Sequence, residues 1–255
     1  MKTYAIILSA GKQTRMEHVK QKCLFNYNGH LLNPDNSKMT ILEANIFSLQ
    51  NYVEKIFVVL NSDVNNSDVL FILDKYSKKY NVEPIMIKSG RGNGHATYEA
   101  IKEIKKSNTI NDDDLCVLMW GDSIQDNSVV LNMLKDCSNN LNNDKMVIPL
   151  NYEKECYMKF EVDNNNNVIS AHKPKTIEPG YHDYSIFLFK TNYIYDLLSI
   201  YVGIYNDNNI KKEIDFIQLF NYCPNTFKAV FPGVSSINAF NTVDEYTNLQ
   251  NIYKI

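Results

Sequence analysis

Hydrophobic residues in the first half of the chain alternate between two patterns. Short apolar runs without polar alternation are typical of strands covered on both faces of a sheet, and they predict strands at 4–9, 56–60, 83–87 and 115–119. The segments between them predict helices at 40–50, 66–79, 95–106 and 127–136. Because strands and helices alternate, we expect an α/β fold with a doubly wound, mostly parallel sheet.

The second half of the chain has a different pattern. Expected strands at 157–162 and 167–171 flank the stretch "DNNNN", which predicts a hairpin connection. A further strand is expected at 184–190, and helices are expected near 192–200 and 212–220. A last helix is expected after Asn241, with Thr242 as its N-cap. We therefore expect a single domain over 1–255 with a small β-rich lobe in its second half.

Composition excludes several classes of protein. The chain has 255 residues, 44% of them hydrophobic, and a net charge of −3, so general affinity for nucleic acid is not expected. No apolar run approaches the roughly 20 residues of a membrane span. The apolar start at residues 4–10 is short for a signal peptide and lacks a convincing cleavage site. Five scattered cysteines without a C-x-x-C pair are typical of reduced thiols, so we expect a cytoplasmic protein.

Glycines and arginines gather after three of the predicted strands. The loops after the first, third and fourth strands contain Gly11, then Gly90, Gly92 and Gly94, then Gly121. The two arginines of the chain, Arg15 and Arg91, lie in the first two of these loops. Ligands bind at the carboxyl ends of parallel strands, and a guanidinium group matches phosphate oxygens. These loops predict a phosphate-binding edge, although chance placement of two arginines is the simpler alternative.

The first loop, "LSAGKQTRM", is followed six residues later by Lys22. It resembles the signature of nucleotidyltransferases that couple a nucleoside triphosphate to a phosphorylated acceptor, such as the sugar-1-phosphate nucleotidylyltransferases. The matching residues are Leu8, Gly11, Thr14, Arg15, Met16 and Lys22. Gln13 stands in place of a second glycine, and Gln21 stands in place of a proline before the lysine. The resemblance implies a nucleotide-diphospho-sugar-transferase-like fold.

The other two loops extend the resemblance. "GRGNGHA" is similar to the family's Gly-Thr-Gly-His-Ala segment, which lines the nucleobase and ribose, with Asn93 in place of threonine. His95 is expected to be a buried histidine at the start of a helix, without a catalytic duty. Asp122 ends the fourth strand where the family holds Mg²⁺, and Asn241 matches the second ligand of the family. The resemblance thus implies Mg²⁺ as cofactor, held by Asp122 and Asn241, since a hard cation prefers oxygen ligands.

The resemblance implies that different segments of the chain bind different substrates. Residues 1–150 would bind the triphosphate, residues 151–240 would bind the acceptor, and residues 241–255 would form a C-terminal helix. Arg15, Lys22 and Asp122 would be the catalytic residues. The triphosphate would contact a larger set: Leu8, Ala10, Gly11, Lys12, Thr14, Arg15, Gly92, Asn93 and Gly94. CTP is expected ahead of UTP.

The acceptor half departs from sugar-using relatives. Lys173 keeps the cation that would bind the acceptor phosphate, whereas His172 replaces a glutamate and Asp183 replaces an asparagine. An acceptor that carries an ammonium group, such as phosphocholine or a phosphorylated amino acid, would suit this change. The chain resembles small cytidylyltransferases of surface-polysaccharide pathways, including those that make CDP-activated phosphoglutamine.

Three other functions stay open from the sequence. One is a sugar-1-phosphate uridylyl- or thymidylyltransferase. Another is a glycosyltransferase, for which Asp112 and Asp114 in "NDDDL" offer an Asp-x-Asp pattern, although it precedes its strand. The third is a protein that binds a nucleotide without turnover. The oligomeric state is also open.

Overall fold

The structure is a computed structural model. It describes residues 1–11, 21–27, 39–88, 90–107, 110–123, 130–132, 134–135, 146–176, 178–208, 212–233, 244 and 246–248.

Four parallel strands form the half of the main sheet that the sequence predicts. They lie in the order β5-β4-β1-β6. Their bounds are β1 Thr3–Leu8, β4 Lys55–Asn61, β5 Val82–Ile87 and β6 Leu115–Trp120. β1 is buried between β4 and β6, as its apolar sequence predicts, so the four predicted strands of the first half are confirmed.

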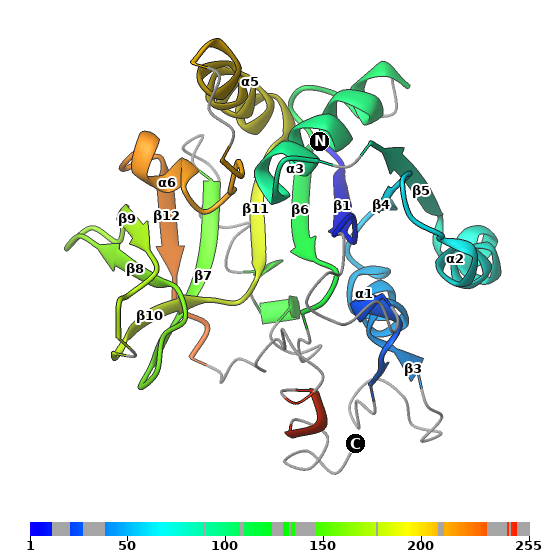
Figure 1. Cartoon of the computed structure of the whole chain (residues 1–255), viewed down its shortest axis with the longest axis horizontal. Helices are drawn as coiled ribbons and strands as arrows, with labels where there is room; N and C mark the ends of the chain where they lie inside the picture. Colours follow the sequence, from blue (N-terminus) through cyan, green and yellow to red (C-terminus); the bar gives the residue numbers. More distant parts are fainter. Residues whose placement is uncertain are drawn as a thin grey trace.

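The sheet continues beyond β6 with mostly antiparallel strands. β11 pairs antiparallel with β6, and the order runs on as β11-β7-β10-β8-β9, while β12 pairs parallel with β7. The bounds are β7 Met146–Glu153, β8 Lys159–Val162, β9 Val168–His172, β10 Gly180–Asp183, β11 Ile186–Lys190 and β12 Phe227–Val230. A separate pair joins β2 (Asn26–Tyr27) to β3 (Met39–Thr40). The fold is a mixed α/β sheet, and β8, β9 and β10 form the lobe at its edge (Figure 1).

Helices cover both faces of the sheet. Their bounds are η2 Lys22–Leu24 (a 3-10 turn), α1 Ile41–Leu49, α2 Ser67–Tyr80, α3 Asn93–Lys106, α5 Thr191–Asp207 and α6 Leu219–Tyr222. α3, α5 and α6 contribute to one core cluster, and α1 and α2 contribute to the other. α3 and α5 lie side by side over the middle of the sheet (Figure 1). The described residues of the helix expected at 127–136 are also helical.

Part of the second half differs from expectation. The strands β7, β10 and β12 are not predicted by the apolar pattern, and the helix expected at 212–220 forms only as α6. Residues 214–216 instead hydrogen-bond across to α3: Gly94 N donates to Ile214 O (2.9 Å), and Phe216 N donates to Asn93 Oδ1 (2.8 Å). A helix would need these same backbone groups for its own ladder, so the tertiary contact replaces the helical turn.

The hairpin expected around "DNNNN" is confirmed. β8 and β9 pair antiparallel, and Asn166 adopts a positive φ of 61° in the connecting turn. The Asp163 carboxylate accepts hydrogen bonds from the backbone N–H groups of Asn165 (2.8 Å) and Asn167 (2.7 Å). Asparagine tolerates the left-handed region, and a short carboxylate can hold the turn, which explains why this polar stretch makes a compact connection.

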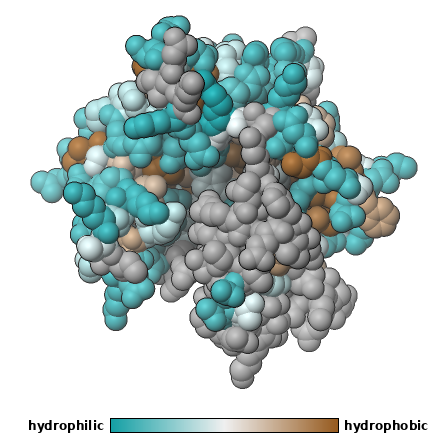
Figure 2. Space-filling model, in the orientation of Figure 1, coloured by the Kyte–Doolittle hydropathy of each residue, from teal (hydrophilic) through white to brown (hydrophobic). Residues whose placement is uncertain are grey.

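The described part of the surface is mostly hydrophilic on the face drawn in Figure 2, where hydrophobic residues appear in small separate groups. Exposed apolar side chains of this kind are ordinary on folded proteins. Among the helices in the described ranges, none combines the length and the apolar character that a membrane crossing requires.

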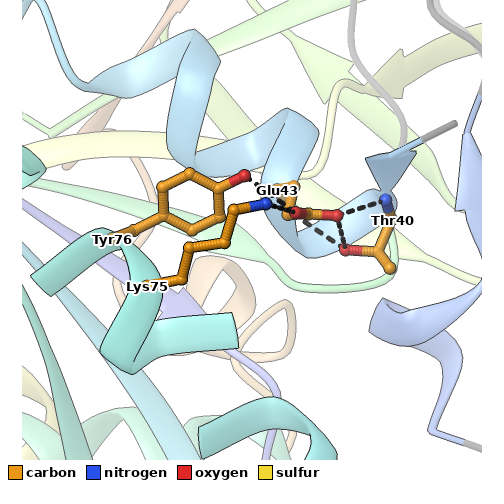
Figure 3. Close-up of polar contacts among 4 residues, drawn as sticks. All are labelled: Thr40, Glu43, Lys75 and Tyr76. Atoms are coloured by element: carbon orange, nitrogen blue, oxygen red, sulfur yellow. Dashed lines mark hydrogen bonds and ion pairs between the residues drawn. The ribbon is translucent and has the colours of Figure 1, made fainter. Parts of the chain in front are cut away.

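The start of α1 is tied to α2 through Glu43 (Figure 3). Thr40 and Glu43 form a capping box: Glu43 N donates to Thr40 Oγ1 (3.2 Å), and Thr40 N donates to Glu43 Oε2 (2.8 Å). The other carboxylate oxygen, Oε1, accepts from Tyr76 Oη (2.8 Å) and Lys75 Nζ (3.4 Å) on α2. Burial raises the pKa of Glu43, but these hydrogen bonds outweigh it, and the pKa lies below its ordinary value of 4.5.

We expect Glu43→Gln to lower the free energy of unfolding by about 1–3 kcal/mol at pH 7, because the amide cannot accept from both sides. The folded-state pKa is depressed, so the contribution of the carboxylate is present above the ordinary value of 4.5 and is lost as pH falls through the lower folded value. The difference between wild type and variant should therefore shrink below pH 4.5. Urea unfolding at several pH values measures it.

Lys75→Gln is the matched control. The Lys75 side chain is 61% exposed, whereas that of Glu43 is 12% exposed. An exposed ion pair contributes about 0–1 kcal/mol, so this variant should unfold close to wild type. Equal decreases in the free energy of unfolding for the two variants would contradict a stabilising role of the Glu43 carboxylate. A decrease for Glu43→Gln that does not depend on pH would contradict it as well.

Candidate active site

The carboxyl ends of β1, β4 and β6 meet at one edge of the sheet. Ser9 N donates to Val59 O (2.9 Å), and Gly121 N donates to Leu8 O (2.9 Å), so the loops after β1 and β6 leave the sheet in contact. A Cβ atom at Gly121 would lie 2.0 Å from Ser9 Oγ and 2.9 Å from Leu8 O. Only glycine fits this close approach. The turn places Asp122 directly at the edge of the sheet.

Lys22 and Asp122 form an ion pair at this edge. Lys22 Nζ lies 2.9 Å from Asp122 Oδ2, and the side chains are 9% and 35% exposed. Lys22 belongs to η2, and Asp122 follows β6, so the fold brings together residues 100 positions apart. The family resemblance names this lysine as the α-phosphate cation and this aspartate as the metal ligand. The structure shows that the two side chains are in contact. Phosphate binding by Lys22 and metal binding by Asp122 stay predictions.

Two buried hydroxyl groups lie on either side of the Gly121–Asp122 turn. Ser9 is 8% exposed and Ser123 is 1% exposed. Neither Oγ atom has a hydrogen-bond partner among the described residues. Buried polar atoms almost always have a partner. This edge therefore has hydrogen-bonding capacity to spare for a polar ligand. Neither serine is predicted from the sequence as a site residue.

The glycine-rich loop after β5 packs against residues 214–216. Gly92 has a φ of 107°, and a Cβ there would lie 2.7 Å from Ile214 O. A Cβ at Gly94 would lie 2.9 Å from the same oxygen. In the segment that this loop resembles, which lines the nucleobase and ribose, glycines would let the backbone approach a planar base. In the structure, the close neighbour of both glycines is another segment of the protein.

Asn93 begins α3 and faces the same segment. Its Oδ1 accepts from Phe216 N (2.8 Å), and its side chain also hydrogen-bonds the Asp215 carboxyl. Contact between Asn93 and a nucleobase stays a prediction, with its amide oxygen already engaged. His95, two residues on, is half-buried, and burial lowers its pKa from 6.5, so its ring is neutral at pH 7. This state suits the expected buried histidine.

Asp183 lies next to the end of β6, at the end of β10. It is the last residue of β10 and is 6% exposed. Its Oδ1 accepts from Ser185 N (2.6 Å), in a turn where Ser185 has a φ of 58°. Ser185 O in turn accepts from Trp120 N (3.0 Å), which joins the turn to β6. Asp183 is therefore a buried turn residue beside the end of β6, the strand that Asp122 follows.

Asp215 is a second carboxyl at this place, and it is not among the site residues predicted from the sequence. Burial raises its pKa, and the negative charges of Glu213 and Asp183 raise it further, against hydrogen bonds from Ile217 N and Asn93 that lower it. Within the described ranges, neither Asp215 nor Asp183 forms an ion pair. The one signal in the sequence is an aspartate inside the apolar stretch "IDFI", which the expected helix concealed.

Trp120 lies between the two carboxyl-bearing segments. It is partly exposed, and its ring packs against Phe187 (5.1 Å between centroids) and Phe216 (5.7 Å). Phe216 follows Asp215, and Phe187 follows the Asp183–Ser185 turn by two residues. An aromatic ring and two carboxyl groups thus share one region. The face of an aromatic ring attracts cations, as carboxylates do.

Lys173 and His172 lie farther out in the lobe. β8 separates β9 from β10, which at about 4.8 Å per strand places these residues roughly 10 Å from Asp183 across the sheet. Lys173 Nζ lies 4.3 Å from the Tyr157 ring centroid and donates to Tyr157 Oη (3.1 Å). His172 ends β9 and is partly exposed. The role of Lys173 as the cation for an acceptor phosphate stays a prediction.

Four predicted residues lie outside the described residues: Lys12, Thr14, Arg15 and Asn241. Leu8, Ala10 and Gly11 are described and lead from β1 to this edge. The described residues contain no group of three His, Cys, Asp or Glu side chains that could hold a metal ion. Asp122 supplies one partly exposed carboxylate, and Mg²⁺ commonly takes one or two carboxylates with phosphate oxygens and water. The donor set fits Mg²⁺ bound together with a phosphate ligand.

Comparisons with known proteins agree with this architecture. No protein-family model matches the sequence, and no curated protein matches it either. Among solved structures, the chain is similar to a protein from Bacillus anthracis assigned as a glucose-1-phosphate thymidylyltransferase, crystallised with sucrose. The TM-score is 0.73 at 13% sequence identity, over 98% of this chain and 94% of that one. The chain therefore has the nucleotide-diphospho-sugar-transferase-like fold that the sequence predicted.

Proposed function

We propose that the chain is a nucleotidyltransferase. It would transfer a nucleoside monophosphate, CMP first and UMP next, from the triphosphate to a phosphorylated small molecule and release pyrophosphate. One observation carries the proposal: Lys22 and Asp122 meet at 2.9 Å at the carboxyl edge of the sheet, where a fold of this kind binds ligands. The hydroxyls of Ser9 and Ser123, which have no hydrogen-bond partner among the described residues, support a polar ligand at the same edge.

The reaction needs charge neutralisation and positioning. The acceptor phosphate has a second pKa near 6 and is therefore an ionised nucleophile at neutral pH. One of its oxygens forms a bond to the α-phosphorus, and the bond from that phosphorus to the bridging oxygen of the β-phosphate breaks. Pyrophosphate leaves with the electron pair. No proton has to be removed, so a general base is unnecessary.

The residues at the edge suit these tasks. Lys22 would neutralise the α-phosphate as negative charge moves during attack, and Arg15 with Lys12 would hold the leaving pyrophosphate. Asp122 and Asn241 would hold Mg²⁺, which when bound neutralises phosphate charge. In the structure described above, Asp122 neutralises Lys22. Binding of a triphosphate would give Lys22 a phosphate partner and release the Asp122 carboxylate.

The acceptor would be a phosphate ester that carries an ammonium group. Asp183 is buried, and its negative charge contributes to the raised pKa of Asp215. Among the residues that the structure describes, neither carboxyl forms an ion pair. Two such carboxyls beside the Trp120 ring favour a cationic group over a neutral sugar hydroxyl. Lys173 would hold the phosphate end. Such a product would serve surface-polysaccharide biosynthesis.

A substrate matrix tests the proposal. Each of the four nucleoside triphosphates is mixed with Mg²⁺ and with phosphocholine, phosphorylated amino acids or sugar 1-phosphates, and pyrophosphate release is measured. We expect the fastest release with CTP and an ammonium-bearing acceptor, and slower release with UTP. Faster release with ATP or GTP than with either pyrimidine triphosphate would contradict the base preference. No release with any pair would point to a protein that binds nucleotide without turnover.

A further inference from the structure

Lys22 lies in a segment that cannot hold its own shape. η2 is one turn of 3-10 helix over Lys22–Leu24, and such short turns depend on their surroundings. On the C-terminal side, Phe25 O accepts from Ile41 N (2.9 Å) at the start of α1, and Cys23 and Leu24 are buried in the core. The orientation of Lys22 toward Asp122 therefore depends on what holds its N-terminal side.

Gln21 holds the N-terminal side of Lys22. Its Nε2 donates to Asn65 O and to Asn66 Oδ1, each at 3.0 Å. Its Oε1 accepts a weak hydrogen bond from Cys23 Sγ (3.8 Å). Both donated bonds reach the loop between β4 and α2, 44 and 45 positions along the chain. They tie the lysine segment to a different part of the sheet.

The acceptor of one of these bonds is itself fixed. Asn66 is 6% exposed, and its Nδ2 donates to Asn61 O (2.8 Å) and Val64 O (3.0 Å). Asn61 is the last residue of β4 and is 1% exposed. A continuous set of contacts thus runs from the end of β4 through Asn66 and Gln21 to Lys22, and then to Asp122 at the end of β6.

The backbone of Gln21 has the shape that a proline would impose. Its φ is −63° and its ψ is 135°, and proline restricts φ to about −65°. Among the described residues, nothing accepts a hydrogen bond from the Gln21 N–H, so a proline at this position would remove none of the backbone hydrogen bonds described. A glutamine has no intrinsic restriction to this conformation. The two side-chain hydrogen bonds supply the restraint instead.

We propose that Gln21 is a positioning residue for Lys22, acting through its hydrogen bonds to the loop at 65–66. The inference rests on the proposed function, because it assigns Lys22 to the reacting phosphate. Gln21 would exert its role through Lys22 and not through contact with the substrate. It fixes the backbone immediately before Lys22, so that the ammonium group is directed to the edge of the sheet before the triphosphate arrives. Misplacement of such a group by about 1 Å can cost up to a hundredfold in rate.

Three variants separate positioning from simple stabilisation. Gln21→Ala removes the hydrogen bonds and the restraint, and Gln21→Glu keeps the length but faces Asn65 O with an oxygen. Gln21→Pro removes the hydrogen bonds but restores the restraint through its ring. Gln50→Ala is the matched control, since Gln50 is a partly exposed glutamine at the C-cap of α1. Steady-state kinetics with CTP and the best acceptor of the substrate matrix give kcat and KM for each.

A second measurement reads Lys22 directly. Acetic anhydride acylates exposed amines, and mass spectrometry follows the Lys22 peptide relative to Lys75, whose side chain is 61% exposed. The paired, 9% exposed Lys22 should react slowly in the wild type. It should react faster in Gln21→Ala and Gln21→Glu, and slowly again in Gln21→Pro. This comparison needs no substrate, so it decides the inference even where the wild type releases no pyrophosphate and the proposed function fails.

The expected kinetic result is a fall in kcat of about 10- to 100-fold for Gln21→Ala and Gln21→Glu, with little change in KM for CTP. Gln21→Pro should return toward the wild-type kcat, and Gln50→Ala should equal the wild type. Wild-type kcat and wild-type Lys22 reactivity in Gln21→Ala would overturn the inference. So would a Gln21→Pro variant that folds but is as slow and as reactive at Lys22 as Gln21→Ala.

Discussion

Asp122→Ala is expected to lower the rate of nucleotidyl transfer at least about a hundredfold, or about 2.7 kcal/mol of transition-state stabilisation. The residue lies at the carboxyl edge of the sheet, its side chain is 35% exposed, and it contacts Lys22. Its loss would remove the proposed metal ligand and leave Lys22 without its carboxylate partner. Pyrophosphate release under saturating CTP and Mg²⁺ measures the effect, and circular dichroism checks that the variant is folded.

Asp113→Ala is the matched control for this experiment. Asp113 is exposed in the turn before β6, at the opposite end of the same strand. Its replacement should leave the rate unchanged. A folded Asp122→Ala variant with near-wild-type turnover would eliminate Asp122 as the metal ligand.

Asp183→Asn is expected to depress kcat/KM for an ammonium-bearing acceptor steeply. Breaking one side of a partly desolvated ion pair costs about 2 to 5 kcal/mol, which corresponds to roughly 30- to 5,000-fold. Asparagine is nearly isosteric, and its Oδ1 can still accept from Ser185 N, so the turn should persist. Steady-state kinetics with each substrate varied in turn measure the loss. The KM for CTP should change little, because the triphosphate loops lie elsewhere.

Two controls accompany Asp183→Asn: the same substitution at an exposed aspartate, and an acceptor without an ammonium group. Asp196→Asn makes the same chemical change at an exposed position of α5 and should have no effect. For an acceptor that carries a phosphate but no ammonium group, kcat/KM should change little in Asp183→Asn. If wild-type enzyme prefers a sugar 1-phosphate to every ammonium-bearing acceptor, the ammonium hypothesis is wrong however Asp183→Asn behaves.

The parallel half of the sheet follows from local pattern. β1 lies between β4 and β6, and its side chains pack into core clusters on both faces of the sheet. Its uninterrupted apolar sequence is therefore the pattern expected for a strand in this position. The β8–β9 hairpin is equally local, since Asp163 and Asn166 make the turn within five residues. The ends of β1 and β6 also predicted where Gly121 and Asp122 would lie, because parallel strands end at a common edge.

β7 and the segment at 212–220 show where local pattern is insufficient. β7 contains Pro149, which argues against a strand when it is read alone. Its neighbours β12, β11 and β10 come from later parts of the chain. The sequence predicts a helix near 212–220, but Asn93 and Gly94 hydrogen-bond the backbone groups of Phe216 and Ile214 that a helix there would need. In both cases the deciding partners are distant in sequence.

The residues of the candidate site likewise fall into those predicted from local sequence and those found only in the tertiary structure. The residue types and spacing around Gly11, Lys22 and Asp122 are sufficient by themselves to predict a phosphate-binding edge, because strand ends and glycine loops are local features. The tertiary structure alone reveals Asp215 beside Asp183 and the contact of Gln21 with Asn66. Those contacts join segments 32 to 45 positions apart, and their energies depend on burial and on geometry that no local pattern encodes.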